Sequence, residues 1–167
     1  ITTRVDRPLM VGEMIGEVAK ERLVDGSKVK VGDVVLLTKG VAIEGTHVIY
    51  QEKKEELKGR FPQKMLNRMR NLIRSPGISV VKEALLASKN VGLRSMHDPT
   101  EGGLKMGLWE LAYNSGVGIR IERRKVPILE ETKAICEMYQ LDPLGLLASG
   151  ALLLIINCLL YTSPSPR

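Results

Sequence analysis

Apolar residues along this chain recur in two spacings, one typical of strands and one typical of helices. Residues 34–38 form a short apolar run bounded by Gly32-Asp33 and Lys39-Gly40, which predicts a buried strand. Residues 151–156 are apolar throughout and predict a second buried strand. Residues 117–122 alternate apolar with small or charged side chains, as a half-buried strand does.

Helical spacing marks most of the remaining chain. Helices are expected from residue 43 or 44 towards residue 57, from 61 or 62 to 73, over 78–88, after residue 104 and near 128–139. Ser75-Pro76-Gly77 and Asn114-Ser115-Gly116 end two of them, because proline and glycine interrupt helices. Strands and helices mix without regular βα alternation, so the predicted fold class is α+β, a mixed sheet with helices packed on its faces.

The most informative stretch is Met-His-Asp-Pro-Thr-Glu-Gly-Gly-Leu at residues 96–104, which leads into a predicted helix. Unpaired backbone N–H groups and the positive end of the helix dipole converge at a helix N-terminus. A glycine there lets a phosphate come within hydrogen-bonding distance of these groups, and Thr100 adds a hydroxyl. The stretch is therefore a candidate anion-binding loop, with Gly102 and Gly103 as backbone donors.

A simpler interpretation explains part of the same stretch without a ligand. Asp98 would be the N-cap, Pro99 the first helical residue and Glu101 the third-position partner of a capping box. This leaves Gly102 and Gly103 unexplained, since each glycine in a helix costs about 0.5–1 kcal/mol relative to alanine. The sequence alone leaves both interpretations open.

A second candidate site combines Thr38-Lys39-Gly40 with Glu44-Gly45-Thr46, where a strand ends, a glycine loop turns and a helix begins. Gly40 frees the backbone, Lys39 offers a compact positive charge suited to phosphate, and Glu44 is suited to holding a metal ion or capping the helix. The spacing is not that of a P-loop, because the lysine precedes the glycine. A purely structural turn and cap is the alternative.

The two histidines and two cysteines suggest few further roles. His97 adjoins Asp98, which makes proton transfer conceivable, whereas His47 lies inside a predicted helix and is expected to be structural. Cys136 and Cys158 have no metal-ligand spacing, which favours a reduced, cytoplasmic protein. Cys136 lies beside an apolar helical stripe and is expected to be a small buried hydrophobe.

Charge and hydropathy argue against two classes of partner, nucleic acids and membranes. The chain has 25 basic and 19 acidic residues and a net charge of +6. Its basic residues between 53 and 74 alternate with Glu52, Glu55 and Glu56, and aromatics for base stacking are nearly missing there, so a solvated helix face is expected rather than a nucleic-acid surface. The longest apolar run is far shorter than the ~20 residues that a membrane span needs, so no membrane partner is expected.

Several linked motifs resemble a known family. In chain order they are His97-Asp98-Pro99-Thr100-Glu101-Gly102-Gly103-Leu104, Glu110-Leu111-Ala112, Ser115-Gly116-Val117-Gly118-Ile119, Val126-Pro127-Ile128, Leu141-Asp142-Pro143-Leu144 and Ala148-Ser149-Gly150-Ala151-Leu152. Their order and spacing resemble the C-terminal domain of the aminoimidazole ribonucleotide (AIR) synthase-related, or PurM-like, superfamily. Upstream, Arg7-Pro8, Val11-Gly12, Gly32-Asp33, Leu37-Thr38-Lys39-Gly40 and Glu44-Gly45-Thr46 look most like its hydrogenase-maturation branch, the HypE type.

This resemblance implies an ATP-dependent enzyme that phosphorylates an amide-type or acyl-type oxygen and then displaces it as phosphate. In the HypE branch the reaction converts a carbamoyl group into a cyano group. The implied cofactors are ATP and Mg²⁺, with Asp98 as the metal contact and Asp98 and His97 as the catalytic candidates. The two candidate loops described above supply the candidate nucleotide contacts, which are Thr100, Glu101, Gly102, Gly103, Lys39, Gly40 and Glu44.

The chain also departs from that branch. It lacks a Pro-Arg-Ile-Cys ending, and it has Glu101 where the HypE type usually has a basic residue. The resemblance implies an extended strand over residues 12–24, although their apolar residues repeat with helical period. A non-catalytic nucleotide-sensing or protein-docking relative with the same fold is therefore the alternative function.

The resemblance also sets the expected domain organisation. Residues 1–157 would be the C-terminal domain, with 1–11 as the end of an N-terminal domain or a linker, and 158–167 would be a non-native, disordered tail. Such a fragment is expected to be inactive alone. The expected partners are a small-molecule or carrier-bound substrate, a second copy through the N-terminal domain, and a maturation factor.

Overall fold

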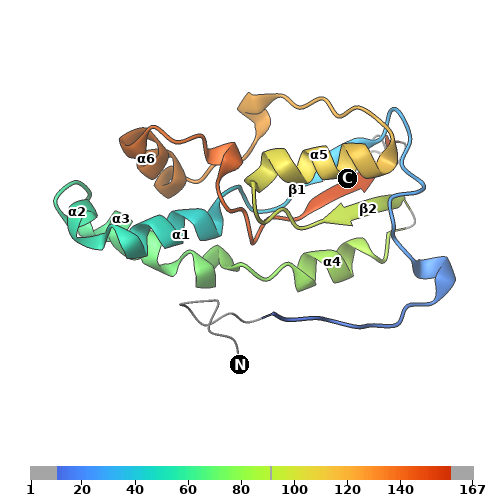
Figure 1. Ribbon diagram of the computed structural model, residues 1–167, viewed down its shortest axis with the longest axis horizontal. Coiled ribbons are helices and arrows are strands. Elements are labelled where there is room, and N and C mark those ends of the chain that lie inside the picture. Colours follow the sequence, from blue (N-terminus) through green and yellow to red (C-terminus); the bar gives the residue numbers. More distant parts are fainter. Residues whose placement is uncertain (1–10, 91, 159–167) are drawn as a thin grey trace, which may run out of the picture.

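A three-stranded antiparallel sheet is the centre of the fold. The computed structural model describes residues 11–90 and 92–158 (Figure 1). Its strands are β1 (Val34–Leu37), β2 (Leu93–His97) and β3 (Leu153–Ile156), in the order β1-β3-β2. Leu153 of β3 lies opposite both Leu37 of β1 and His97 of β2. Because β3 is antiparallel to both neighbours, β1 and β2 run in the same direction and end at the same edge of the sheet.

The described residues also form six α-helices: α1 (Ile43–Glu52), α2 (Lys54–Lys58), α3 (Gln63–Asn71), α4 (Val81–Ala87), α5 (Gly103–Ser115) and α6 (Glu130–Tyr139). Helix α5 lies along the sheet, whereas α1, α2, α3 and α6 gather beyond the edge where β1 and β2 end (Figure 1). The α+β class predicted from the sequence is confirmed. The ladders among the described residues are antiparallel, and the parallel pairing is an isolated bridge between Val41 and Ile128.

Two apolar cores hold these parts together. The first lies between the sheet and α5 and contains Val41, Leu104, Leu111, Leu144, Leu153 and Ile155. The second lies among α1, α2, α3 and α6 and contains Tyr50, Leu57, Leu66, Met69 and Ile135. Burying one such side chain contributes about 1.5–3 kcal/mol, so each core is large enough to fix its own helices. The turns that follow β1 and β2 lie between the two cores.

Most elements match the predictions within a few residues. The strands expected at 34–38 and 151–156 are β1 and β3. The long helix expected from residue 43 is broken at Lys53 into α1 and α2. Cys136 is buried as predicted, and burial raises the pKa of its thiol to about 11. Within the described residues, no helix combines the length and apolar character that crossing a membrane requires.

The strand expected at 117–122 is wrong. These residues have no ladder partner, and they line one side of a cavity of about 840 Å³ whose other side includes β1. Ile119 packs against the sheet core, but Ile121 is 42% exposed. The alternating pattern therefore reports one-sided burial of a loop rather than strand pairing, because periodicity in sequence does not supply a neighbouring backbone.

The strand implied over residues 12–24 is also wrong. The described part of this segment contains a 3₁₀ turn at Lys20–Arg22, and Met14 and Ile15 are 96% and 89% exposed. A strand needs a hydrogen-bonding neighbour, and the described residues place none beside this segment. Residues 1–10 and 159–167 lie outside the described residues, so the predictions for both ends of the chain are untested.

Candidate functional site

The turns after β1 and β2 are joined by one segment, residues 144–152, which we call the bridging segment. The N–H of Thr38 donates to the carbonyl of Leu152 at 3.0 Å, and the Leu152 N–H donates to the Thr38 hydroxyl at 3.0 Å. The Ala148 N–H donates to the carbonyl of Thr100 at 3.1 Å. The bridging segment thus fixes both candidate loops, 38–42 and 98–102, at one edge of the sheet.

Helix α5 begins later than the capping-box interpretation requires. Its N-cap is Gly102, with φ at 72°, and no side chain caps it. Asp98 lies four residues earlier, and Pro99 is fully buried against Gly107 rather than in the first helical turn. The capping role predicted for Asp98, Pro99 and Glu101 is therefore wrong.

Both glycines of this loop have a structural reason that does not involve a ligand. Gly103 has φ at 64°, and a Cβ there would lie 2.7 Å from the carbonyl oxygen of Leu144. At Gly102 a Cβ would lie 2.7 Å from Cβ of Met106. Positive φ and close backbone approach both favour glycine. The glycine pair by itself is thus no argument for a bound phosphate, although it brings the helix N-terminus to the loop.

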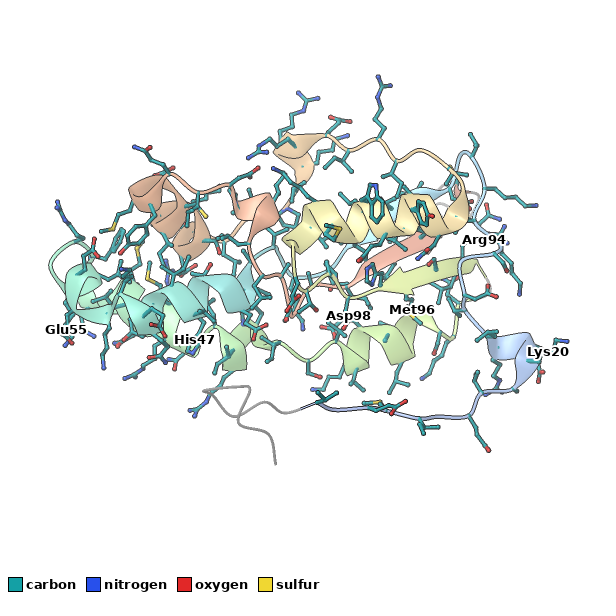
Figure 2. All side chains as sticks on the ribbon, viewed as in Figure 1. Lys20, His47, Glu55, Arg94, Met96 and Asp98 are labelled. Carbon is teal, nitrogen blue, oxygen red and sulfur yellow. The ribbon has the colours of Figure 1, made fainter. Side chains whose placement is uncertain are left out.

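His97 and Asp98 stand together at the end of β2. Nε2 of His97 lies 2.6 Å from Oε2 of Glu110 on α5, and Nδ1 lies 4.0 Å from Oδ1 of Asp98. The Asp98 side chain is 66% exposed and projects where β2 runs into the loop (Figure 2). Thr100 is exposed, with its hydroxyl donating to the Asp98 carbonyl at 3.4 Å, and Glu101 is also exposed. The loop thus presents polar side chains to solvent, next to the His97–Glu110 contact.

The 38–42 loop has an unusual backbone. Lys39 and Ala42 have φ of 55° and 57°, values that residues other than glycine rarely adopt. A Cβ on Gly40 would lie 3.1 Å from the Pro127 carbonyl oxygen, so this glycine also serves close packing. Glu44 is half-buried in the first turn of α1. Strain of this kind gathers at functional sites, which keeps the loop a candidate.

The Lys39 ammonium is already bound within the protein. Nζ lies 3.1 Å from Oε1 of Glu83, and it donates to the carbonyls of Ser79 at 2.6 Å and Gly77 at 3.3 Å. The pKa of the Glu83 carboxyl is lowered, first by its own backbone N–H and then by Lys39. The ion pair and hydrogen bonds that the described residues give to Lys39 are with residues 77–83 and not with Asp98. A phosphate would have to compete with Glu83 for this ammonium.

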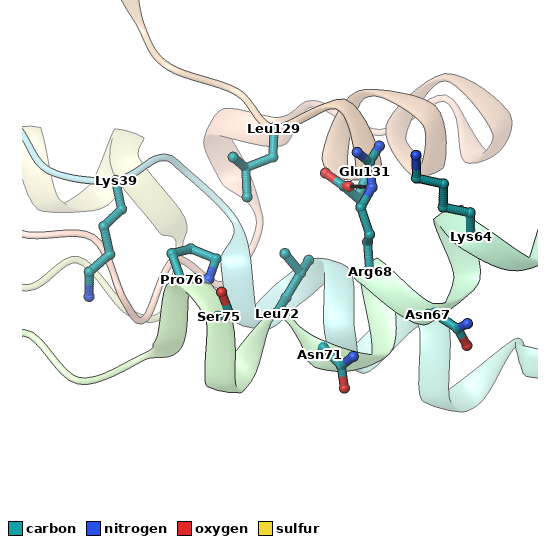
Figure 3. A pocket seen from close by; sticks show the side chains of 10 residues that line it. All are labelled: Lys39, Lys64, Asn67, Arg68, Asn71, Leu72, Ser75, Pro76, Leu129 and Glu131. Carbon is teal, nitrogen blue, oxygen red and sulfur yellow. Dashed lines mark ion pairs between the residues drawn. The ribbon is translucent and has the colours of Figure 1, made fainter.

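A cavity of about 650 Å³ opens beside Lys39 and runs along α3 (Figure 3). Lys39 lies at one end and Lys64 at the other, with Leu72 and Leu129 between them. Its Arg68 forms ion pairs with Glu130 at 2.9 Å and with Glu131, whose carboxylate is buried. These carboxylates neutralise the Arg68 guanidinium, so Arg68 is not free to bind an anion in this cavity.

The carboxylates near the two loops suit a metal ion only if phosphate groups supply its other ligands. Among residues 11–90 and 92–158, no three His, Cys, Asp or Glu side chains come together as a metal site. Mg²⁺ bound to a nucleotide needs one or two carboxylates and keeps water and phosphate oxygens as its other ligands. Asp98 meets that smaller requirement.

Sequence reasoning missed Glu110 and the bridging segment. Glu110 follows Gly103 by seven residues, about two helical turns, which places it on the same side of α5. No spacing rule connects it to His97, because that contact depends on how α5 packs against β2. The bridging segment gave no chemical signal, since its contribution to the site is made by backbone groups.

Fold and loops together define an α+β domain that presents two strand-end turns beside a helix N-terminus. Residues 30–157 match the family "AIR synthase related protein, C-terminal domain". The chain belongs to this family. The resemblance that its motifs suggested is thereby confirmed.

Individual relatives point to the hydrogenase-maturation branch. The chain is 30% identical over 142 residues to the carbamoyl dehydratase HypE of Cupriavidus necator, covering 84% of this chain but 37% of that protein. A crystal structure of HypE in complex with ATP aligns with a TM-score of 0.60 at 22% identity, over 84% of this chain and 39% of the other. HypE from a HypE–HypF complex aligns with a TM-score of 0.57 at 26% identity, over 79% and 40%. The chain thus spans about two fifths of these relatives.

Proposed function

We propose that this chain is the C-terminal domain of an ATP-dependent, HypE-like enzyme that activates an amide-type or acyl-type oxygen by phosphorylation. The observation that carries the proposal is the meeting of loops 38–42 and 98–102 on the bridging segment, in a chain of this family. Phosphoryl transfer needs positioned donors and charges more than covalent help from the protein. Strained loops beside a helix N-terminus are suited to that task.

The roles proposed for single residues follow from their positions. Asp98, exposed at the loop, would contact a magnesium ion that arrives with ATP and neutralises phosphate charge. His97 would take up the proton that the substrate amide loses when its oxygen is phosphorylated. Thr100, Glu101, Gly102 and Gly103 would line the phosphates on one side, and Lys39, Gly40 and Glu44 would do so on the other.

The proposed setting follows the same relatives. A carrier-bound carbamoyl group is the proposed substrate, and a maturation factor is the proposed partner, as the HypE–HypF complex suggests for that relative. The nucleotide would be bound chiefly by an N-terminal domain. That domain would also form the contacts of a homodimer. The enzyme would act in the cytoplasm. Because the chain covers 37% of its carbamoyl dehydratase relative, we expect no ATPase activity from it alone.

The test uses two proteins, this chain and a longer protein that joins it to a family N-terminal domain. Calorimetric titration with MgATP should show binding to the longer protein and none in the micromolar range to residues 1–157 alone. Asp98→Asn in the longer protein should lower ATP turnover at least about tenfold, equivalent to ~1.4 kcal/mol in barrier. Its melting temperature should not change, because Asp98 is exposed and caps no helix.

Asp25→Asn, a change of the same chemistry at a different exposed site, is the matched control and should keep full turnover. Normal turnover in Asp98→Asn would exclude the proposed metal contact. Micromolar ATP affinity in the chain alone would overturn the division of roles between the domains.

A non-catalytic docking relative is the second candidate, and one observation favours it. Met106, Trp109 and Tyr113 are 43%, 59% and 72% exposed along one side of α5, and the two aromatic rings stack with centroids 5.1 Å apart. Exposed Trp and Tyr are typical of the centre of a protein interface. A longer protein that binds a partner through this stripe without hydrolysing ATP would support this alternative.

A further inference from the structure

The exposed side of α5 carries a row of large side chains, Met106, Trp109 and Tyr113, which we call the α5 stripe. Their spacings of three and four residues place them on one face of the helix, over about two turns or ~10 Å. Trp109 is 59% exposed, Tyr113 is 72% exposed, and their rings stack with planes 17° apart. Anchors at these spacings are what a second helix covers when it packs along the first.

A basic border lies beside the N-terminal half of the stripe. Lys105 precedes Trp109 by four residues, so the two side chains are neighbours on the helix surface. Nζ of Lys105 lies 2.6 Å from one carboxylate oxygen of Asp142, and the Arg123 guanidinium lies 2.7 Å from the other. Asp142 therefore holds the 3₁₀ turn Arg123–Lys125 next to the first turns of α5 (Figure 1).

This border keeps an excess of positive charge. Its ion pairs join four basic side chains to only two carboxylates: Lys105 and Arg123 to Asp142, and Arg124 and Lys125 to Glu122. The Arg124 side chain is 85% exposed, so its charge reaches solvent. A positive edge attracts a partner that carries carboxylates and repels one that is basic. A second copy of this chain would bring the same positive border and a net charge of +6.

The same residues favour a protein over a nucleic acid. Because the two rings stack on each other, each has only one face left for a base, and Glu110, 42% exposed on the same helix, would repel phosphates. We propose that the α5 stripe and its basic border bind an acidic amphipathic helix of a partner protein. Aliphatic side chains of that helix would cover Trp109 and Tyr113, and its carboxylates would face the border. This inference goes beyond the proposed function, because it does not depend on ATP chemistry.

Fluorescence of Trp109 provides the test, since it is the single tryptophan of the chain. The probe is a capped synthetic helical peptide without tryptophan, with leucine at positions i, i+3 and i+7 and glutamate at the flanking positions. Titration of this chain should shift the emission to shorter wavelength, with saturation in the micromolar range, because Trp109 loses its water. Raising the salt from low to physiological concentration should increase Kd at least about threefold. The same peptide with lysine for glutamate should bind at least about tenfold more weakly.

Two exposed variants locate the site while keeping the fluorophore. Tyr113→Ala and Arg124→Glu should each increase Kd about tenfold, the first by removing the stacked ring and the second by reversing charge on the border. Their controls are Leu86→Ala, at an apolar residue of α4 that is 73% exposed, and Arg60→Glu, at an exposed residue between α2 and α3. Both controls should bind as the wild type does. The melting temperature of all four variants should equal that of the wild type.

Several outcomes would overturn the inference. The acidic peptide leaves the emission unchanged, or the lysine peptide binds equally well. A single-stranded oligothymidine shifts the emission while the acidic peptide does not, which would make the surface one for nucleic acid. A shift that grows with the concentration of the chain alone would assign the stripe to a second copy. In the longer protein, emission that is already shifted and does not respond to the peptide would assign it to the N-terminal domain.

Discussion

The hydroxyl of Thr46 on α1 and the hydroxyl of Thr132 on α6 lie 2.8 Å apart, and both residues are fully buried. This hydrogen bond joins the helix that follows the 38–42 loop to the helix that follows the segment packed against Gly40. Each hydroxyl is the hydrogen-bond partner of the other, so removing one leaves the other buried without that partner. The pair therefore has a test that separates polar from apolar packing.

Thr46→Val and Thr132→Val should each lower the free energy of unfolding by about 1–3 kcal/mol, because the remaining hydroxyl stays buried without its partner. The double variant should lose much less than the sum, since two methyl groups of similar shape then face each other. Urea unfolding of the wild type, both single variants and the double variant measures the coupling. Additive losses would show that the hydroxyls do not depend on each other.

Gly103→Ala should destabilise the chain by at least about 2 kcal/mol. The new Cβ would be forced on a residue with φ at 64° and would lie 2.7 Å from the Leu144 carbonyl oxygen. Gly118→Ala is the matched control, because nothing lies within 4 Å of its Cβ position and its φ is not positive. The urea midpoint of both variants decides the matter. If the Gly103→Ala chain is as stable as Gly118→Ala, the backbone around residue 103 rearranges to accept a Cβ without loss of folding free energy.

Asp142 makes the chain sensitive to acid. The Arg123 guanidinium, and then the Lys105 ammonium, hold the pKa of this carboxyl well below its usual range. A carboxyl whose pKa is lowered on folding stabilises the protein above the pKa it has when unfolded, roughly 4, and this stability is lost as pH falls below that value. Wild-type chain should therefore lose more stability than Asp142→Asn between pH 6 and pH 3, as measured by urea unfolding. Asp25 is exposed, and the pKa of its carboxyl is lowered first by hydrogen bonds with Ser27 in its own turn, so Asp25→Asn should change the slope less than Asp142→Asn does.

Much of the fold could be predicted because its signals are local. The apolar runs of β1 and β3 and the helical spacing of α5 are properties of single segments, and the structure confirms them. The strand prediction for residues 117–122 was wrong, because alternation of apolar and polar residues cannot show whether a neighbouring strand exists. The strand end before Lys39 was expected and is confirmed, whereas no strand was predicted where β2 lies, and the meeting of the two loops was not predicted either.

The interior of the site could not be predicted, because it depends on contacts between segments. Glycine at position 103 suggested a phosphate, whereas the structure shows that the backbone of the bridging segment occupies the space of a Cβ. Lys39 suggested a free cation, whereas Glu83, forty-four residues later in the chain, already holds it. Glu110 was part of a family motif, but nothing in the sequence connected it to His97. Residue type and spacing identify candidate groups, but the partner that each group finds is decided by packing.

The Lys39–Glu83 ion pair gives the sharpest test of whether Lys39 serves the nucleotide. If Lys39 binds phosphate in the longer protein, Glu83 competes for the same ammonium at 3.1 Å. Lys39→Met should then weaken MgATP binding, and Glu83→Gln should strengthen it, each by about threefold to tenfold, since 1.4 kcal/mol corresponds to tenfold. Both changes remove one partner of the same pair, so each is the control for the other. If both variants bind ATP as the wild type does, Lys39 is only a structural clamp on residues 77–83; if both weaken binding equally, the intact pair rather than the free ammonium shapes the loop.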